Sequence, residues 1–161
     1  MLTIHTNGFV YFSQNDLISG LSSDLDTRTS GGIYYQNLNS QSKDFNSIKS
    51  GINRLNSAFD PTNLFRITFE NVPLFGNNKM LASFQIILAS SSSSSFVVLN
   101  YTSCLSNMIL RTAPGIYFIN NIPPPSQISN PCSSSNVNLP GMWVFDVSIQ
   151  SGMSLILNYF S

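Results

Sequence analysis

Six consecutive serines at positions 90–95 separate two segments in which branched and aromatic residues dominate, 81–89 and 96–101. In the first segment Phe84, Ile86 and Leu88 occupy every second position, which is the period of a strand with one face toward a core. Two strands joined by a short polar link form an antiparallel hairpin. The chain is therefore expected to contain an antiparallel β-sheet.

Other segments have the same extended character. Asn7-Gly8 lies between two extended stretches and predicts a hairpin with a type I′ turn, which needs positive φ at both central residues. Gly31-Gly32 is expected to supply the unusual φ of a second turn. Strand patterns then recur at residues 33–36, 64–72 and 142–147.

One segment has the period of a helix. Its apolar residues recur at spacings of three and four, which places them on one helix face: Phe45, Ile48, Ile52, Leu55 and Phe59. Ser42 or Asp44 can cap the start, and Asp60-Pro61 ends the pattern because proline cannot continue a helix. A helix over residues 44–59 is predicted, packed on a sheet.

About seven strands and one helix, without a repeat or a βαβ rhythm, predict a mainly β (α+β) fold. The expected architecture is an antiparallel β-sandwich with the helix on one side. Residues 1–150 form the domain, and residues 151–161 form a C-terminal tail that can add a last strand. The large aromatic side chains are expected in the core rather than on a ligand platform: Tyr34, Phe84, Trp143 and Phe145.

Charge excludes several classes of function. Seven basic and seven acidic residues give a formal net charge of zero, and charged residues make up 9% of the chain. A nucleic-acid-binding face needs clustered Lys and Arg, whereas these are scattered. No run of about 20 apolar residues is present to span a membrane, and the first residues do not form a signal peptide.

Asp24 and Asp26 are the only close pair of carboxylates. Their spacing on an extended chain points both to one side, where they could hold a hard cation such as Ca²⁺. The favoured alternative is structural: the carboxylates accept hydrogen bonds from amides of the turn at 27–32, or pair with Arg28. Catalysis by this pair is disfavoured, and no cofactor is expected apart from the Ca²⁺ alternative.

Two cysteines, Cys104 and Cys132, are compatible with one disulfide, which would stabilise the fold by about 3 to 4 kcal/mol in the chain-entropy model. Two unpaired thiols are the alternative. A serine hydrolase needs a histidine base, and His5 is the only histidine. No nucleophile elbow or phosphate-binding loop is present, so the chain is not expected to be an enzyme.

Five stretches resemble, in order, the motifs of the NIDO domain, the module shared by nidogen, alpha-tectorin, mucin-type membrane proteins and the sushi/nidogen/EGF-domain proteins. These stretches are 6–12 (TNGFVYF), 24–35 (DLDTRTSGGIYY), 67–73 (ITFENVP), 83–101 and 135–145 (SNVNLPGMWVF). The amino-acid sequences of these stretches are most similar to those of tectorin-like members. The chain begins inside the first strand of the family pattern, so it is interpreted as truncated at its N-terminal edge.

The resemblance implies a non-enzymatic, extracellular cell–matrix adhesion or protein-interaction module, part of a larger multidomain matrix or cell-surface protein. Its partners would be extracellular matrix or cell-surface proteins. Secretion and glycosylation are implied too, and Asn100-Tyr101-Thr102 is an N-glycosylation acceptor triplet. The alternative function is a Ca²⁺-dependent or carbohydrate-binding domain that uses the Asp24/Asp26 loop.

Overall fold

The computed structural model describes residues 2–11, 17–21, 23–103, 115–117 and 131–148, which form two antiparallel sheets and one helix. The smaller sheet has the order β1-β2-β3-β8, with the bounds Thr3–His5, Phe9–Tyr11, Leu17–Ser19 and Gly115–Tyr117. The larger sheet has the order β4-β5-β6-β7-β9, with the bounds Gly32–Asn37, Asn63–Leu74, Asn77–Ser90, Ser95–Ser103 and Met142–Asp146. The predicted antiparallel sandwich with one helix is confirmed.

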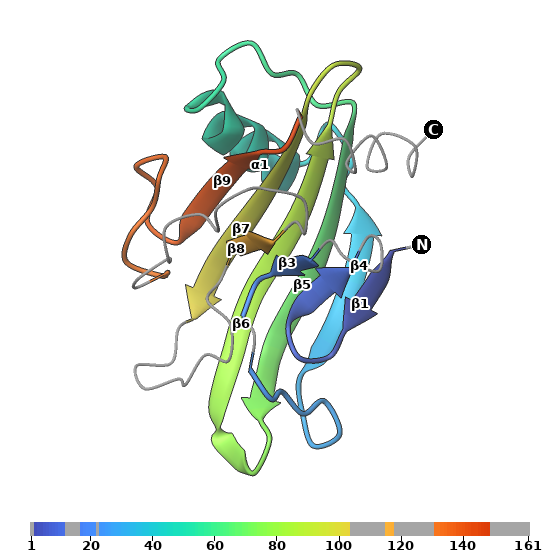
Figure 1. The fold of residues 1–161 in the computed structure, drawn as a ribbon, viewed down its shortest axis with the longest axis vertical. Helices are drawn as coiled ribbons and strands as arrows, with labels where there is room; N and C mark the ends of the chain where they lie inside the picture. Colours follow the sequence, from blue (N-terminus) through green and yellow to red (C-terminus); the bar gives the residue numbers. More distant parts are fainter. Residues whose placement is uncertain (1, 12–16, 22, 104–114, 118–130, 149–161) are drawn as a thin grey trace.

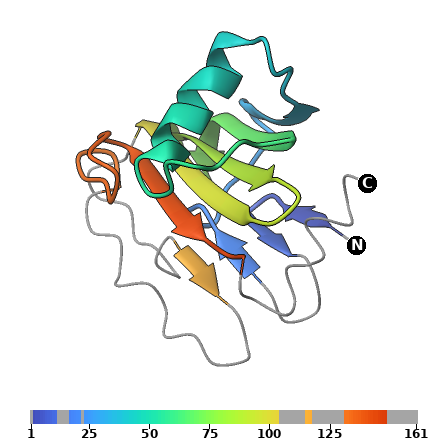
Figure 2. The same ribbon diagram turned by 90° about the horizontal axis from the view of Figure 1, so that it is seen from above.

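The larger sheet is the middle of three layers. The smaller sheet packs on one of its faces, called here the inner face, and helix α1 (Lys43–Asn53) lies over the opposite, outer face (Figures 1 and 2). Side chains of a strand alternate between two faces, so β6 and β7 supply apolar residues to both layers. Buried Leu88 and Val97 face the smaller sheet, whereas buried Ile87 and Val98 belong to the cluster beneath the helix.

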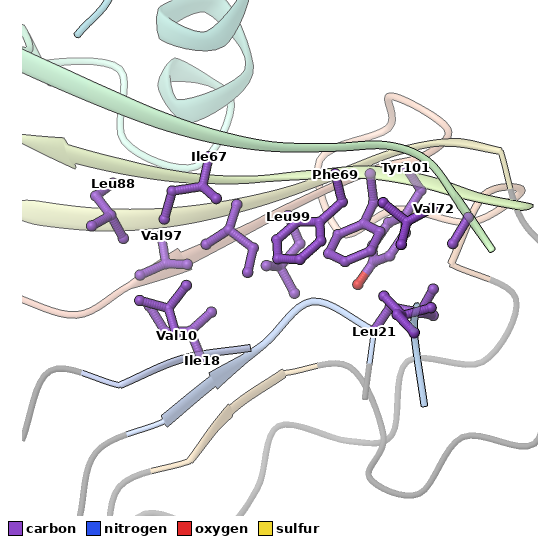
Figure 3. Close-up of a cluster of buried hydrophobic side chains, with 14 of the residues drawn as sticks. Val10, Ile18, Leu21, Ile67, Phe69, Val72, Leu88, Val97, Leu99 and Tyr101 are labelled. Carbon is purple, nitrogen blue, oxygen red and sulfur yellow. The ribbon is translucent and has the colours of Figure 1, made fainter. Parts of the chain in front are cut away.

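The inner core depends on a row of aromatic rings across three neighbouring strands. Phe69 and Phe84 stack with centroids 4.5 Å apart, and Tyr101 follows Phe84 at 6.1 Å (Figure 3). The buried hydroxyl of Tyr101 donates a hydrogen bond to the carbonyl oxygen of Gly20, next to β3. The row therefore joins the two sheets by packing and by a satisfied buried polar group.

Two glycines allow the smaller sheet to approach this row. A Cβ on Gly20 would lie 2.5 Å from Cε2 of Phe84. A Cβ on Gly8 would lie 3.1 Å from Cζ of Phe84, and 2.2 Å from the carbonyl oxygen of Leu21 within its own layer. Gly8 also has φ of +87°, and its carbonyl oxygen accepts hydrogen bonds from the amides of Gly20 and Leu21. A larger residue at either position would separate the layers.

The turn at Gly8 differs from the predicted type I′ turn. His5 pairs with Phe9, so three residues form the loop, and of the two predicted positions only Gly8 has a positive φ. A three-residue loop ending in a left-handed glycine is a common alternative in hairpins. The Asn-Gly pair therefore predicted the hairpin correctly and its turn type wrongly.

Helix α1 begins as predicted but ends early. Ser42 caps it by accepting a hydrogen bond from the amide of Phe45, and the last helical residue is Asn53 rather than residue 59. Leu55 is consequently exposed, although the pattern had placed it on the buried face, while Phe59 returns to the core from a following turn. The apolar period continued past the point where the backbone leaves the helix.

The other strand predictions agree with the structure in outline. Ser90 pairs with Ser95, and residues 91–94 form the turn of the predicted serine hairpin. Gly31 has φ of +72°, but its neighbour Gly32 has no positive φ. Tyr34 was expected in the core and is 57% exposed, because β4 is an edge strand that the helix does not cover. Cys104 and the tail at 151–161 lie outside the described residues.

Gly8 and Gly76 offer a matched test of the close approach between the sheets. Gly76 has φ of +76° with nothing within 4 Å of an added Cβ, so Gly76→Ala measures backbone strain alone, about 1 kcal/mol. Gly8→Ala adds collisions with the backbone of Leu21 and, across the two sheets, with Cζ of Phe84, and should cost roughly 1–3 kcal/mol more. Urea unfolding of both variants gives the difference, and equal losses would contradict the packing role of Gly8.

Candidate functional site

The acidic loop predicted to be a site is fixed to one end of the larger sheet. Leu25 forms a β-bridge with Leu74, at the end of β5. The amide of Asp26 donates to the carbonyl oxygen of Pro73 at 2.8 Å, and the amide of Phe75 donates to that of Asp24 at 2.7 Å. The loop is thus held by backbone hydrogen bonds beside the tip of the β5–β6 hairpin.

Asp26 and Arg28 form a two-pronged ion pair in this loop. Arg28 Nε donates to Asp26 Oδ1 at 2.7 Å and Nη2 donates to Oδ2 at 2.8 Å, while the amide of Arg28 also reaches Oδ1 at 3.0 Å. These hydrogen bonds lower the pKa of Asp26 to about 2 and raise the pKa of Arg28. The structure therefore shows the favoured alternative for Asp26, pairing with Arg28.

The ion pair places a cation over an exposed aromatic ring. The guanidinium carbon of Arg28 lies 5.4 Å from the ring centroid of Phe75, a cation–π distance, and Phe75 is 58% exposed. A shallow surface pocket of about 330 Å³ runs between them and the first hairpin, lined in part by His5 and Asp24. We call Asp26, Arg28 and Phe75 the Arg–Phe corner.

Phe75 was not identified from the sequence. It directly precedes Gly76 at the tip of the β5–β6 hairpin, where a large aromatic residue has no core to enter. An aromatic residue next to a turn glycine, between two strands, was the available signal. Its proximity to Arg28 could not be predicted in the same way. The two residues are about 46 positions apart in the chain and are brought together by the Leu25–Leu74 bridge and the backbone hydrogen bonds beside it.

His5 has a local role in its hairpin. Its Nδ1 accepts a hydrogen bond from the amide of Asn7 at 3.2 Å, and its ring stacks on Phe9 with centroids 4.4 Å apart. The histidine lies at the rim of the same pocket as Arg28. These contacts give the ring a defined position at the end of β1.

Asp24 and Asp26 are not joined by a third side chain of the types that most often bind metals, in the part of the chain that the structure describes. No group of three His, Cys, Asp or Glu side chains occurs within the described residues. A cation bound through Asp26 would have to displace Arg28 from both carboxylate oxygens. A Ca²⁺ site at Asp24 and Asp26 stays a prediction.

Asn100 and Thr102 lie on the outer face of β7, beyond the helix. Asn100 is half-buried and its Nδ2 donates to Gln85 Oε1 at 3.1 Å, while Thr102 is exposed and donates to the carbonyl oxygen of Ser83. The intervening Tyr101 points to the inner core. Asn100 and Thr102 thus lie on a polar part of this face that is not covered by helix α1. Cys132 is not a free thiol, and its predicted partner Cys104 lies outside the described residues.

Comparison with known proteins identifies one family. The family model described as Nidogen-like domain (NIDO) matches residues 2–108, more than half of the chain. The matched range contains the acidic loop, Phe75 and Asn100. No curated protein and no solved structure matches the chain significantly. Within the described residues, α1 is too short and too polar to cross a bilayer.

The Asp26–Arg28 pair predicts a specific response to acid. The pKa of Asp26 is lower in the folded chain than in the unfolded chain, so its stabilising effect is complete above about pH 4 and is lost as the pH falls toward 2. Over that range the wild type should lose more stability than Asp26→Asn or Arg28→Gln. Urea unfolding at several pH values measures the slopes, and identical slopes in all three proteins would contradict the pairing.

Proposed function

The chain belongs to the nidogen-like domain (NIDO) family, and from this premise we propose that it is a non-enzymatic, extracellular module that binds matrix or cell-surface proteins. The family is one of protein-interaction domains in larger, typically extracellular proteins. The match over residues 2–108 is the observation that carries the proposal. We place the chain among the tectorin-like members because the amino-acid sequences of its motifs are most similar to theirs.

We propose the Arg–Phe corner as the contact surface. Aromatic residues and arginine are enriched at protein interfaces, because each contributes a large contact area together with directional interactions. Here Asp26 already fixes the guanidinium of Arg28 over the ring of Phe75. Little side-chain entropy is lost when a partner binds a pair that is already ordered, which favours affinity.

The low charge of the chain supports recognition by shape and hydrogen bonding. With 9% charged residues and a net charge of zero, the chain has no strong field to attract a polyanion. The charge at the corner is balanced locally by the Asp26–Arg28 ion pair. A partner is therefore expected to present an apolar group to Phe75 and neutral polar groups to the surrounding loops.

A binding assay on matrix deposited by cultured cells tests this surface. The folded, oxidised chain should bind saturably, and Phe75→Ser should raise the Kd by about tenfold because an interface anchor is lost. Leu55→Gln is the matched control, since Leu55 is also exposed but follows helix α1, which lies near the end of the molecule opposite the β5–β6 hairpin tip (Figure 1). Equal Kd values for both variants would place the contact elsewhere, and no saturable binding would contradict the proposed function.

The same assay separates the alternative function. A Ca²⁺-dependent or carbohydrate-binding role would use Asp24 and Asp26, so binding would then require added Ca²⁺ or be blocked by free sugar and would be lost in Asp26→Asn. The proposed protein-binding role predicts binding in the presence of a chelator. Removal of calcium and addition of free sugar together therefore separate the two functions.

Passage through the secretory pathway should leave two chemical marks. When the chain is expressed behind a secretion signal, we expect an N-glycan on Asn100 that an endoglycosidase removes. Asn100→Gln should abolish it, whereas Thr102→Ser preserves the acceptor triplet and should retain it. We also expect no titratable thiol, because Cys104 pairs with Cys132, and a lower Tm after reduction. Two free thiols, or an unmodified Asn100, would contradict this part of the proposal.

A further inference from the structure

Strand β4 forms one edge of the larger sheet, with β5 as its only strand neighbour in the described structure (Figure 1). Four of its six residues are exposed, Tyr34 at 57% and Tyr35 at 69% among them. The strand reads GIYYQN, without a charge or a proline. Natural sheets often protect an exposed edge with charged residues or proline, because unpaired backbone groups bind other strands.

The alternation of the antiparallel ladder shows which backbone groups of β4 face outward. The amide of Leu38, directly after β4, donates to the carbonyl oxygen of Leu64 at 2.8 Å. Hydrogen-bonded and non-hydrogen-bonded positions alternate, so the even-numbered residues of β4 bond to β5. The amides and carbonyls of Ile33, Tyr35 and Asn37 therefore point away from the sheet.

The opposite edge of the same sheet, strand β9, is covered by two polar side chains from the preceding loop. Asn136 Oδ1 accepts from the amide of Val144 at 2.9 Å, and its Nδ2 donates to the carbonyl oxygen of Val144 at 2.6 Å. Ser135 Oγ also donates to the carbonyl oxygen of Met142 at 2.6 Å. This edge, β9, is therefore satisfied in the manner of a paired strand, whereas β4 has no such cover among the described residues.

We propose that β4 pairs with β4 of a second copy of this chain, so that two larger sheets join into one continuous ten-stranded sheet. Antiparallel pairing about a two-fold axis centred on Tyr35 places Ile33 opposite Asn37 of the second copy. All three outward-facing residues then meet an outward-facing residue and exchange two hydrogen bonds with it. An axis centred on any other residue leaves at least one of the three without such a partner within β4.

Charge and side-chain chemistry fit this register. On one face the two Tyr35 rings lie opposite each other, and on the other Tyr34 lies opposite Gln36, so cross-strand aromatic and polar pairs form. The nearest charges are on β5. In the joined sheet, the residues directly opposite one another in the row of Arg66 are Gln36, then Tyr34 and Thr68 of the second copy, so this row holds no second charge. Arg66 is also already paired with Asp44. No like charges are brought opposite each other.

The edge of a single six-residue strand is small compared with the area of a stable dimer interface, which is about 1,200 Å² or more. The dimer should therefore be weak and depend on concentration. The inference goes beyond the proposed function, because self-association through β4 and partner binding at Phe75 use different surfaces.

Charge reversal at the two-fold axis gives the sharpest test. Sedimentation velocity of the full, oxidised chain over a concentration series should show a monomer–dimer equilibrium. Tyr35→Lys or Tyr35→Glu, each alone, should raise the dimer Kd by about fivefold or more, because like charges face each other. An equimolar mixture of the two should dimerise at least as well as the wild type, and Leu55→Lys, with the same added charge elsewhere, should leave the Kd unchanged.

A second variant and a second measurement keep the test independent of the tyrosine. Asn37→Pro removes an outward amide that β5 does not use, so the fold should survive while dimerisation weakens. By NMR the amides of Ile33, Tyr35 and Asn37 should exchange with solvent faster in dilute than in concentrated wild-type samples. A wild type that stays monomeric, unaffected dimerisation of Tyr35→Lys, or a mixture that stays dissociated would each overturn the proposal. Protection of these amides only by an extended peptide from another protein would also overturn it.

Discussion

The close approach of the two sheets at Gly8 and Gly20 is the constraint on which the rest of the structure depends. The row of Phe69, Phe84 and Tyr101 is wide and flat, and it can be covered only by backbone that lacks a Cβ at the points of contact. Closely packed rings gain dispersion energy and are removed from water. A gap between the layers would reduce both stabilising contributions. The hydroxyl of Tyr101 then needs an acceptor, which the carbonyl of Gly20 supplies.

This packing also positions the proposed contact surface. The segment that leaves Gly20 continues through Leu21 and Leu25, which are both buried in the inner core. Leu25 is thereby brought beside Leu74, and the loop that follows carries Asp26 and Arg28 to the tip of the β5–β6 hairpin. The two halves of the Arg–Phe corner are thus anchored in the same core, although the side chains of Arg28 and Phe75 are exposed.

The sequence predicted the elements better than their relations. Alternation in β6 and spacing in α1 are local patterns, so the serine hairpin and the start of the helix could be predicted. The exposure of Tyr34 depends on β4 being an edge strand, and the stacking of Arg28 on Phe75 depends on a bridge between distant segments. Neither fact has a local signature. The family motifs supplied part of this missing information, because they were selected in the context of the whole fold.

Several of the few charges of this chain serve its own structure, and this influences how it can recognise others. In the described residues the ion pairs join Arg28 to Asp26, Arg66 to Asp44 and Lys49 to Asp60, and Arg54 donates to the carbonyls of Val137 and Asn138. Lys49, Arg66 and Arg54 each join the helix or its end to a neighbouring segment, whereas Arg28 pairs within its own loop. Besides Arg28 of the Arg–Phe corner, the exposed groups available for recognition are mostly uncharged: aromatic rings, neutral side chains and the open backbone of β4. Such groups give short-range contacts that depend on shape and are insensitive to salt, unlike steering by charge. Specific binding by this domain must therefore come from geometric fit.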